Sequence, residues 1–260
     1  MKKRPKIGLA LGGGAARGYA HIGVIKVLTE EKIPIDFISG TSIGALIGAL
    51  YSVGIDIQML EKLALSIKRE NWVDFIIPRK GLLAGKKIEQ IIRLLTKNKN
   101  LEEVDIPLTV TATDLKTGKE VLLRKGNIAK AVRASISIPG IFVPVIMENM
   151  ILVDGAVLNK VPADAVRQMG ADIVIAVDLG FDKRIRLNNI YDILLQTFDI
   201  MGRELLKTKI LNADIIIRPK LGDIDPSNFN QPKDCIIEGE KAARDALPKI
   251  LQFLKEGVQD

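Results

Sequence analysis

The chain of 260 residues has very little of several residue types that define common functional sites. It contains one cysteine, Cys235, and one histidine, His21, so it cannot form an internal disulfide or a zinc site of the usual ligand set. Aromatic residues make up only 4% of the sequence, and the aromatic signatures of RNA-binding domains are missing. We therefore expect no metal site, no nucleic acid partner and a reducing compartment.

Long apolar runs and interdomain linkers are also missing. The most apolar window, Ile43 to Val53, is far shorter than the roughly 20 residues that a membrane-spanning helix needs. The apolar segment near the start is interrupted by Arg17, which argues against a signal peptide. Because no low-complexity run or Ser/Gly/Pro-rich linker divides the chain, we predict a single domain over residues 1–260. We expect a cytoplasmic protein, at most peripheral to the inner face of a membrane.

The charge balance is basic. Lys and Arg total 38 against 31 Asp and Glu, which gives a formal net charge of +7. Such a charge attracts an anionic membrane or an anionic substrate, although a mildly basic surface without such a partner is the simpler interpretation. In the segment Asn71 to Gly85, apolar side chains including Trp72 and Ile76 lie among basic ones. This mixture predicts a lid or a membrane-facing patch, with a buried connection as the alternative.

Strands and helices alternate along most of the chain. Apolar runs such as Ile7–Leu11 and Asp172–Val177 are typical of strands buried on both faces. The pattern predicts an α/β fold with three layers, α/β/α, around a mostly parallel central sheet. The other expected strands are 34–39, 107–114, 120–123, 143–147, 150–153 and 214–217. The expected helices are 15–31, 43–53, 56–69, 86–96, 160–169, 189–211 and 236–254.

A glycine loop, Gly12-Gly13-Gly14-Ala15-Ala16-Arg17-Gly18, joins the first strand to the first helix. The backbone N–H groups from Gly12 to Ala15 are unobstructed by bulky side chains and can stabilise an oxyanion. Arg17 would brace the loop or bind an anionic head group. The alternative is a dinucleotide-binding loop, but the glycine spacing departs from G-x-G-x-x-G by one residue. The acidic residue that such a site needs at the end of the second strand is also missing.

A second motif, Gly40-Thr41-Ser42-Ile43-Gly44, has the spacing G-x-S-x-G. It follows an apolar strand and precedes an apolar helix, as required for the sharp turn that exposes a nucleophilic serine. Gly40 and Gly44 remove side chains where the strand and helix backbones crowd together. Ser42 is therefore the candidate nucleophile, and a mere helix-capping serine is the simpler alternative.

We expect the base that activates Ser42 to be an aspartate and His21 to be structural, with a catalytic His21 as the alternative. The only histidine, His21, precedes the serine, which excludes a hydrolase with the chain order Ser…Asp…His. Three aspartates end apolar strands, namely Asp114, Asp154 and Asp178. Asp154 is modestly preferred because the glycine after it permits a tight turn toward the serine. Asp178 remains a rival, and Asp114 is better explained as the cap of a hairpin turn.

Taken in order, these motifs resemble those of the patatin-like phospholipases, in particular the branch related to neuropathy target esterase. The resemblance rests on the glycine loop, Tyr19-Ala20-His21-Ile22-Gly23, the Ser42 motif, the block from Ala134 to Pro144, and Asp154-Gly155-Ala156. Ala15 stands where the family usually has a fourth glycine.

The resemblance implies a patatin-like α/β/α fold and a Ser42–Asp154 dyad that needs no histidine, cofactor or metal. It also implies hydrolysis of lipid acyl esters, of the phospholipase A or lysophospholipase type, through an acyl-enzyme. The oxyanion hole would comprise Gly12, Gly13, Gly14 and Ala15. The supporting residues would be Arg17, Gly18, Gly40, Gly44 and Gly155. Three alternatives remain: a lipid acyltransferase with the same dyad, a nucleotide-dependent oxidoreductase and a non-catalytic lipid carrier.

Overall fold

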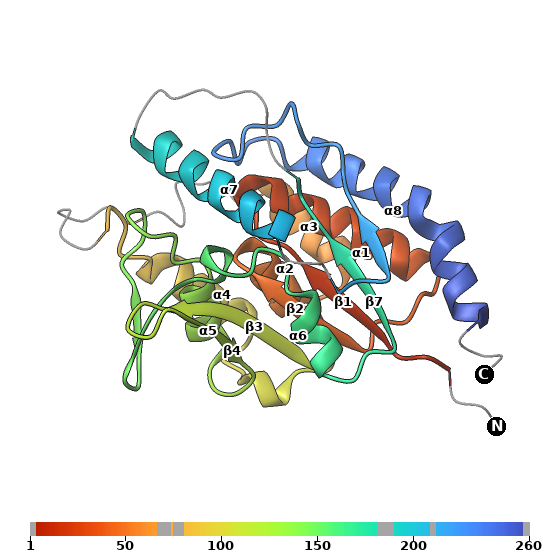
Figure 1. The fold of residues 1–260 in the computed structure, drawn as a ribbon, viewed down its shortest axis with the longest axis horizontal. Coiled ribbons are helices and arrows are strands. Elements are labelled where there is room, and N and C mark those ends of the chain that lie inside the picture. Colours follow the sequence, from red (N-terminus) through yellow and green to blue (C-terminus); the bar gives the residue numbers. More distant parts are fainter. Residues whose placement is uncertain (1–3, 67–73, 75–80, 181–189, 209–211, 257–260) are drawn as a thin grey trace.

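The structure, a computed structural model, describes residues 4–66, 74, 81–180, 190–208 and 212–256. These residues form an eight-stranded mixed sheet of order β5-β6-β3-β2-β1-β7-β8, with β4 paired to β3 (Figure 1). The strands are β1 (Ile7–Leu11), β2 (Phe37–Thr41), β3 (Leu108–Asp114), β4 (Lys119–Leu123), β5 (Val145–Met147), β6 (Met150–Asp154), β7 (Ile173–Val177) and β8 (Ile215–Ile217). The helices are α1 (Ala20–Glu30), α2 (Ile43–Ser52), α3 (Ile57–Ser66), α4 (Lys86–Leu95), α5 (Ile128–Ser135), α6 (Ala163–Gln168), α7 (Ile190–Thr208) and α8 (Pro232–Glu256).

The centre of the sheet is parallel. Strands β3, β2, β1, β7 and β8 pair with their neighbours in parallel, and their connections contain helices. Strands β4, β5 and β6 pair antiparallel and extend the β3 side of the sheet, because short turns connect β3 to β4 and β5 to β6. The prediction of a mostly parallel sheet is confirmed for the centre, and the sheet as a whole is mixed.

Helices cover both faces of this sheet. Along β1, Leu9 and Leu11 pack into one apolar core, whereas Ala10 packs into a second core on the opposite face. The first core contains residues of α1, α2, α3, α4, α5 and α8, and the second contains residues of α6. This alternation follows from the period of two residues in a strand. The predicted three-layer α/β/α fold is confirmed.

Several element boundaries differ from the prediction. The first helix opens with a 3-10 turn, η1 (Ala15–Tyr19), before α1 begins. Strand β2 begins at Phe37 instead of residue 34, since its pairing with β1 starts at Gly8 and Phe37. Helix α6 begins at Ala163 instead of residue 160, directly after Pro162. Helix α8 begins four residues earlier than expected, at Pro232, a residue that suits the first helical position.

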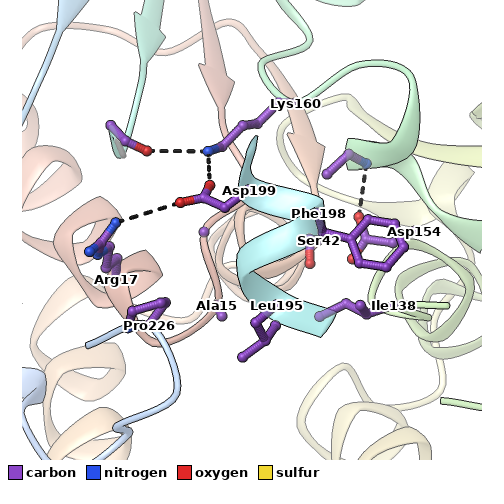
Figure 2. Close-up of a pocket in the computed structure, with 14 residues that line it drawn as sticks. Ala15, Arg17, Ser42, Ile138, Asp154, Lys160, Leu195, Phe198, Asp199 and Pro226 are labelled. Atoms are coloured by element: carbon purple, nitrogen blue, oxygen red, sulfur yellow. Dashed lines mark hydrogen bonds and ion pairs between the residues drawn. The ribbon is translucent and has the colours of Figure 1, made fainter. Parts of the chain in front are cut away.

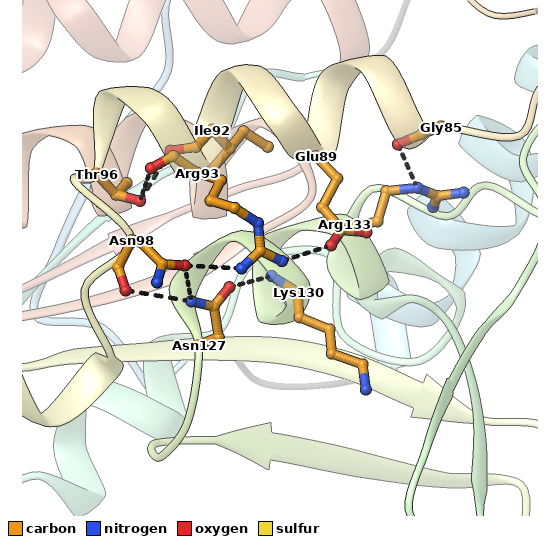
Figure 3. A network of polar contacts seen from close by, with 9 residues as sticks. All are labelled: Gly85, Glu89, Ile92, Arg93, Thr96, Asn98, Asn127, Lys130 and Arg133. Atoms are coloured by element: carbon orange, nitrogen blue, oxygen red, sulfur yellow. Dashed lines mark hydrogen bonds and ion pairs between the residues drawn. The ribbon is translucent and has the colours of Figure 1, made fainter.

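Helix α5 was not among the predicted elements, and a polar network joins it to α4 (Figure 3). The side chain of Asn127 caps α5 by accepting a hydrogen bond from the Lys130 N–H at 3.3 Å. It also donates to the side chain of Asn98 at 3.0 Å. Arg93 of α4 donates to Asn98 at 2.7 Å and to Glu89 at 2.9 Å. The capping asparagine before an apolar stretch is the sequence signal that predicts this helix.

Arg133 of α5 is buried and binds several carbonyl groups at once. Its guanidinium donates to the carbonyl oxygens of Gly85 (3.1 Å), Ala84 (2.7 Å) and Val143 (2.9 Å). Burial lowers its pKa to about 10. We expect Arg133→Ala to lower the free energy of unfolding by about 3 kcal/mol or more, because it leaves buried carbonyls unpaired.

Urea unfolding measures this loss, and Lys130→Ala on the exposed face of the same helix is the matched control. The control is expected to change stability by less than about 0.5 kcal/mol. Equal effects of the two substitutions would contradict a structural role for the Arg133 contacts.

Most of the predicted lid or patch, Asn71 to Gly85, including Trp72 and Ile76, lies outside the described residues. In its described part, Leu83 is buried and forms a parallel bridge with Phe142. Asp74 accepts hydrogen bonds from the N–H groups of Gly85 and Lys86 at the start of α4. Among the helices that the structure describes, none is long and apolar enough to cross a membrane.

Candidate active site

Ser42 lies in a sharp turn between β2 and α2. Its backbone has φ 55° and ψ −123°, in the left-handed half of conformational space that residues with a side chain rarely adopt. Its N–H donates to Ser135 Oγ at 2.8 Å. A Cβ atom at Gly40 would lie 2.5 Å from Ala45 Cα, and one at Gly44 would lie 2.2 Å from the Leu11 carbonyl oxygen. The turn therefore requires glycine on both sides of the serine.

Strand β3 brings Ser42 next to Asp154. Strand β2 pairs with the first part of β3, and β6 pairs with the part that follows. Since β4 pairs with both parts, it occupies the opposite edge of β3, and β2 and β6 share one edge. Thr41 is paired with Thr111, and Asp154 is paired with Ala112. The carboxyl ends of β2 and β6 therefore meet at consecutive residues of β3, and Figure 2 shows Ser42 beside Asp154.

Asp154 is buried, and only 3% of the residue is exposed. It accepts a hydrogen bond from the Ala156 N–H at 2.8 Å. Burial raises the pKa of Asp154 to about 7, and hydrogen bonding with the Ser42 side chain and with the Ala156 N–H opposes this rise. A carboxylate with a pKa near 7 is a much better proton acceptor at neutral pH than an exposed aspartate with a pKa of about 3.9.

The two rival aspartates have other partners. Asp178 accepts hydrogen bonds from the Gly180 N–H and from Arg218, both at 3.0 Å. Asp114 accepts hydrogen bonds from the Ile151 N–H at 3.0 Å and the Thr117 hydroxyl at 2.8 Å, which holds the turn after β3. Neither residue lines the pocket that contains Ser42. The geometry therefore favours Asp154 as the partner of Ser42.

The glycine loop presents fewer open N–H groups than expected. The Gly12 N–H donates to the Val177 carbonyl at 3.1 Å, and the Gly13 N–H donates to the Lys160 carbonyl at 2.9 Å. Both groups serve to hold the loop. The N–H groups of Gly14 and Ala15 have no hydrogen-bond acceptor among the residues that the structure describes, and both residues line the pocket with Ser42. Of the four expected oxyanion donors, Gly12 to Ala15, the N–H groups of Gly14 and Ala15 therefore remain as candidates.

Ala15 and the neighbouring glycines shape the loop. Ala15 has φ 47°, so it adopts the left-handed conformation that a glycine would adopt at lower cost. A Cβ atom at Gly18 would lie 2.2 Å from Ile43 Cγ1, and one at Gly155 would lie 2.4 Å from Thr111 Oγ1. Gly18 therefore lets the loop pack closely against Ile43, beside Ser42, and Gly155 lets the turn after Asp154 pack closely against β3.

His21 helps to hold the glycine loop through a hydrogen bond to Gly12. It is fully buried, and its Nε2 lies 2.7 Å from the Gly12 carbonyl oxygen. Burial lowers its pKa to about 4, against the opposing effect of the hydrogen bond with Gly12. His21 does not line the pocket. Because His21 lies outside the pocket and its Nε2 is bonded to the Gly12 carbonyl, the geometry does not favour it as the base for Ser42.

We expect His21→Gln, which keeps a side-chain N–H for the Gly12 carbonyl, to retain ester hydrolysis within about tenfold. Its stability should differ from wild type in a pH-dependent way. The unfolded state binds the imidazole proton below pH 6.5, whereas the folded state binds it only near pH 4. The wild type therefore loses about 3 kcal/mol of unfolding free energy as the pH falls from 6.5 to 4, and the variant does not.

Chemical denaturation at pH 4 and pH 7 measures this difference. A constant stability difference between wild type and His21→Gln over this range would contradict a buried neutral His21. Loss of hydrolysis in a folded variant would instead indicate a histidine-assisted site.

The pocket measures about 590 Å³ including its open mouth. At one end Ser42 and Asp154 lie beside Ile138 and Phe198 (Figure 2). The other end contains charged side chains from separate parts of the chain. The whole pocket is lined by Gly13, Gly14, Ala15, Arg17, Ser42, Ile138, Asp154, Ala156, Lys160, Gly180, Leu195, Phe198, Asp199 and Pro226.

Sequence reasoning missed two of the charged lining residues, Lys160 and Asp199. Lys160 belongs to no motif, and Asp199 lies within the predicted helix 189–211, whose inward face the pattern does not identify. Arg17, which was expected, is buried and donates through Nε to the Ile224 carbonyl at 2.9 Å. The described part of the chain holds no group of three or more His, Cys, Asp or Glu side chains placed to bind a metal ion.

Comparison with known proteins identifies the family of this chain. A family model described as patatin-like phospholipase matches residues 9–167. An uncharacterized NTE family protein of Mycobacterium tuberculosis is 37% identical over 179 residues, which cover 68% of this chain and 49% of that protein. A patatin-like phospholipase domain-containing protein of Caenorhabditis elegans, ZK370.4, is 37% identical over 194 residues, covering 72% of this chain and 14% of that protein. The chain thus spans about half, or less, of the length of these relatives.

Two solved structures share the fold. VipD from Legionella pneumophila superimposes with a TM-score of 0.53 at 16% identity, over 98% of this chain and 67% of that one. The type III effector ExoU superimposes with a TM-score of 0.52 at 14% identity, over 100% of this chain and 54% of that one. The matched family model covers more than half of the chain, including the glycine loop, the Ser42 turn and Asp154. The chain therefore belongs to the patatin-like phospholipase family.

Proposed function

We propose that the protein hydrolyses acyl esters of lipids, with Ser42 as nucleophile and Asp154 as base. One observation carries this proposal: Ser42 stands in a strained turn beside a buried carboxyl group whose pKa is raised to about 7. Gly14 and Ala15 line the same pocket, and their N–H groups supply the oxyanion donors. Family membership favours this interpretation of the glycine loop over the dinucleotide-binding one.

The mechanism has two stages. In the first, the Asp154 carboxylate takes the hydroxyl proton as Ser42 Oγ attacks the ester carbonyl carbon. The carbonyl oxygen becomes an oxyanion held by the two loop N–H groups, and Asp154 returns the proton to the departing alcohol. In the second, a water molecule gives its proton to Asp154 and attacks the acyl-enzyme carbonyl. The fatty acid leaves, and the proton returns to Ser42 Oγ.

The pocket is matched to this chemistry. One oxyanion donor is worth roughly 10²–10³ in rate when it is preorganised. Here the loop is held in place before substrate binds, since the Gly12 and Gly13 N–H groups are already bonded to neighbouring strand and loop carbonyls.

The side chains of Ile138, Leu195 and Phe198 provide apolar walls that suit an acyl chain. The net charge of +7 supports contact of the protein with an anionic lipid surface.

The direct test is a product survey. Wild-type protein and the Ser42→Ala variant are incubated with a mixed lipid extract, and the released fatty acids and alcohols are identified by mass spectrometry. Fatty acid release by the wild type alone supports the proposal. Acyl transfer to an added alcohol without free fatty acid would show an acyltransferase instead. No turnover of any lipid or simple aryl ester would contradict both.

A further inference from the structure

The strained turn at Ser42 is held by a side chain from another part of the chain. A backbone with φ 55° and ψ −123° is unfavourable for a residue with a side chain, and it persists only where the surrounding structure fixes it. The Ser42 carbonyl accepts the Leu46 N–H at 3.1 Å, a local contact in the first turn of α2. The Ser42 N–H donates instead to Ser135 Oγ, at the end of α5, at 2.8 Å.

The environment of this hydrogen bond makes it important for the turn. Ser135 is fully buried, and Ser42 is only 6% exposed. A buried N–H that loses its acceptor cannot turn to water, so the loss is costly. Without the Ser135 oxygen, the turn would relax toward a conformation in which the Ser42 N–H finds another acceptor. The Ser42 hydroxyl would then leave its place beside Asp154.

The same segment of the chain also holds Asp154. Two residues after Ser135, the Ser137 carbonyl accepts the Asp154 N–H at 2.9 Å. The segment Ser135 to Ser137 therefore binds the backbone N–H of the candidate nucleophile and that of the candidate base. Because the two acceptors belong to one short stretch of chain, they fix the separation of the ends of β2 and β6.

The segment from Ser135 to Ser137 is itself firmly anchored. The Ser137 N–H donates to the Ala134 carbonyl at 3.1 Å, and Ser137 Oγ donates to the Arg133 carbonyl at 2.7 Å. The Arg133 guanidinium donates to Ser137 Oγ and to the Gly85 carbonyl at the start of α4 (Figure 3). The end of α5 thus has a fixed place to which the two members of the dyad are tied.

We propose that Ser135 is a positioning residue of the active site: its Oγ holds the Ser42 turn in the conformation that places the nucleophile beside Asp154. The inference rests on the proposed function and adds a residue on which that function depends. Ser135 does not line the pocket, so it acts through the backbone of Ser42 and not on the substrate.

Hydrogen exchange of the Ser42 amide tests the contact without turnover. Serine amide nitrogens are isotope-labelled for NMR, and the Ser42 signal is identified by its absence from Ser42→Ala. We expect exchange about tenfold faster or more in Ser135→Ala, because the acceptor is gone. The matched control is Ser39→Ala in β2, which removes an equally buried hydroxyl that donates to the Pro162 carbonyl at 2.7 Å. It should leave exchange at Ser42 within about threefold of wild type.

The consequence for the reaction is measured on folded protein by fatty acid release and by fluorophosphonate labelling over a range of pH. In Ser135→Ala we expect kcat to fall by about 100-fold with little change in KM, since the nucleophile is misplaced but the lipid pocket is intact. The hydrogen bond with Ser42 lowers the pKa of Asp154, so weakening it should move the midpoint of the labelling profile upward from about 7. Ser39→Ala should keep the wild-type kcat and midpoint. A purely structural role for Ser135 would change the yield of folded protein and neither of these values.

Unchanged exchange of the Ser42 amide in Ser135→Ala would overturn the inference. Faster exchange with a wild-type kcat and midpoint would overturn it as well, because the turn would then not control the nucleophile. The proposed function can fail separately. Fast exchange in Ser135→Ala, together with no hydrolysis or labelling of the wild type, would sink the proposed function and leave Ser135 as the residue that holds the turn.

Discussion

Replacing Ser42 by alanine is expected to lower kcat/KM for lipid-ester hydrolysis by about 10⁴-fold or more, comparable to the loss of a nucleophile in other serine hydrolases. The reason is chemical: without the hydroxyl there is no acyl-enzyme, and only the oxyanion donors and binding contacts remain. A fatty acid release assay with purified protein measures the effect. Ser66→Ala, on an exposed serine at the end of α3, is the matched control and should be unaffected.

Asp154→Asn is expected to cause a loss of similar order. The amide keeps the shape of the side chain and can still accept the Ala156 N–H, but it cannot take a proton from Ser42. Asp164→Asn, on an exposed aspartate of α6, controls for the loss of one negative charge. Residual hydrolysis within tenfold of wild type in either the Ser42 or the Asp154 variant would rule out the dyad.

The second large effect concerns stability. The pKa of Asp154 is about 7 in the fold, against the 3.8 that is usual for an unperturbed aspartate. Between these values the folded state holds a proton that the unfolded state has released, so stability falls as the pH rises from about 4 to above 7. The loss amounts to about 4 kcal/mol. An asparagine at this position carries no such penalty, so Asp154→Asn should be increasingly more stable than wild type as the pH rises.

Urea unfolding of both proteins at pH 4, 6 and 8 measures this trend. His21 is present in both, so its opposite contribution cancels from the difference. The Asp164→Asn control should show no comparable trend. A stability difference that stays flat with pH would mean that Asp154 is already ionised throughout this range, and it would remove the physical basis for its role as a base.

The local parts of the site could be predicted from the sequence. The backbone around Ser42 is so crowded that positions 40 and 44 must be glycine. The G-x-S-x-G motif therefore predicts the geometry of this turn. The same holds for Gly18 and Gly155, where a side chain would clash with Ile43 or Thr111. Strands β7, β5 and β6 were predicted within a few residues, since β7 is a continuously buried apolar run and a short turn separates β5 from β6.

The long-range parts could not be predicted in this way. Ser42 and Asp154 meet because β2 and β6 end at consecutive residues of β3, a register that no local pattern records. Residue order alone also does not show that the Gly12 and Gly13 N–H groups are bonded to distant carbonyls. For this reason the predicted oxyanion hole was wider than the one the geometry supports. Lys160 and Asp199 meet only through the packing of α7.

The most direct test of the Ser42–Asp154 dyad is labelling with a fluorophosphonate over a range of pH, followed by mass-spectrometric mapping of the modified residue. We expect one adduct, on Ser42, formed at a rate that rises with pH to a plateau with a midpoint near 7, the pKa of Asp154. The Asp154→Asn variant should label far more slowly at every pH. An adduct on a different serine would contradict the dyad, and so would a Ser42 labelling rate that is the same in wild type and in the Asp154→Asn variant.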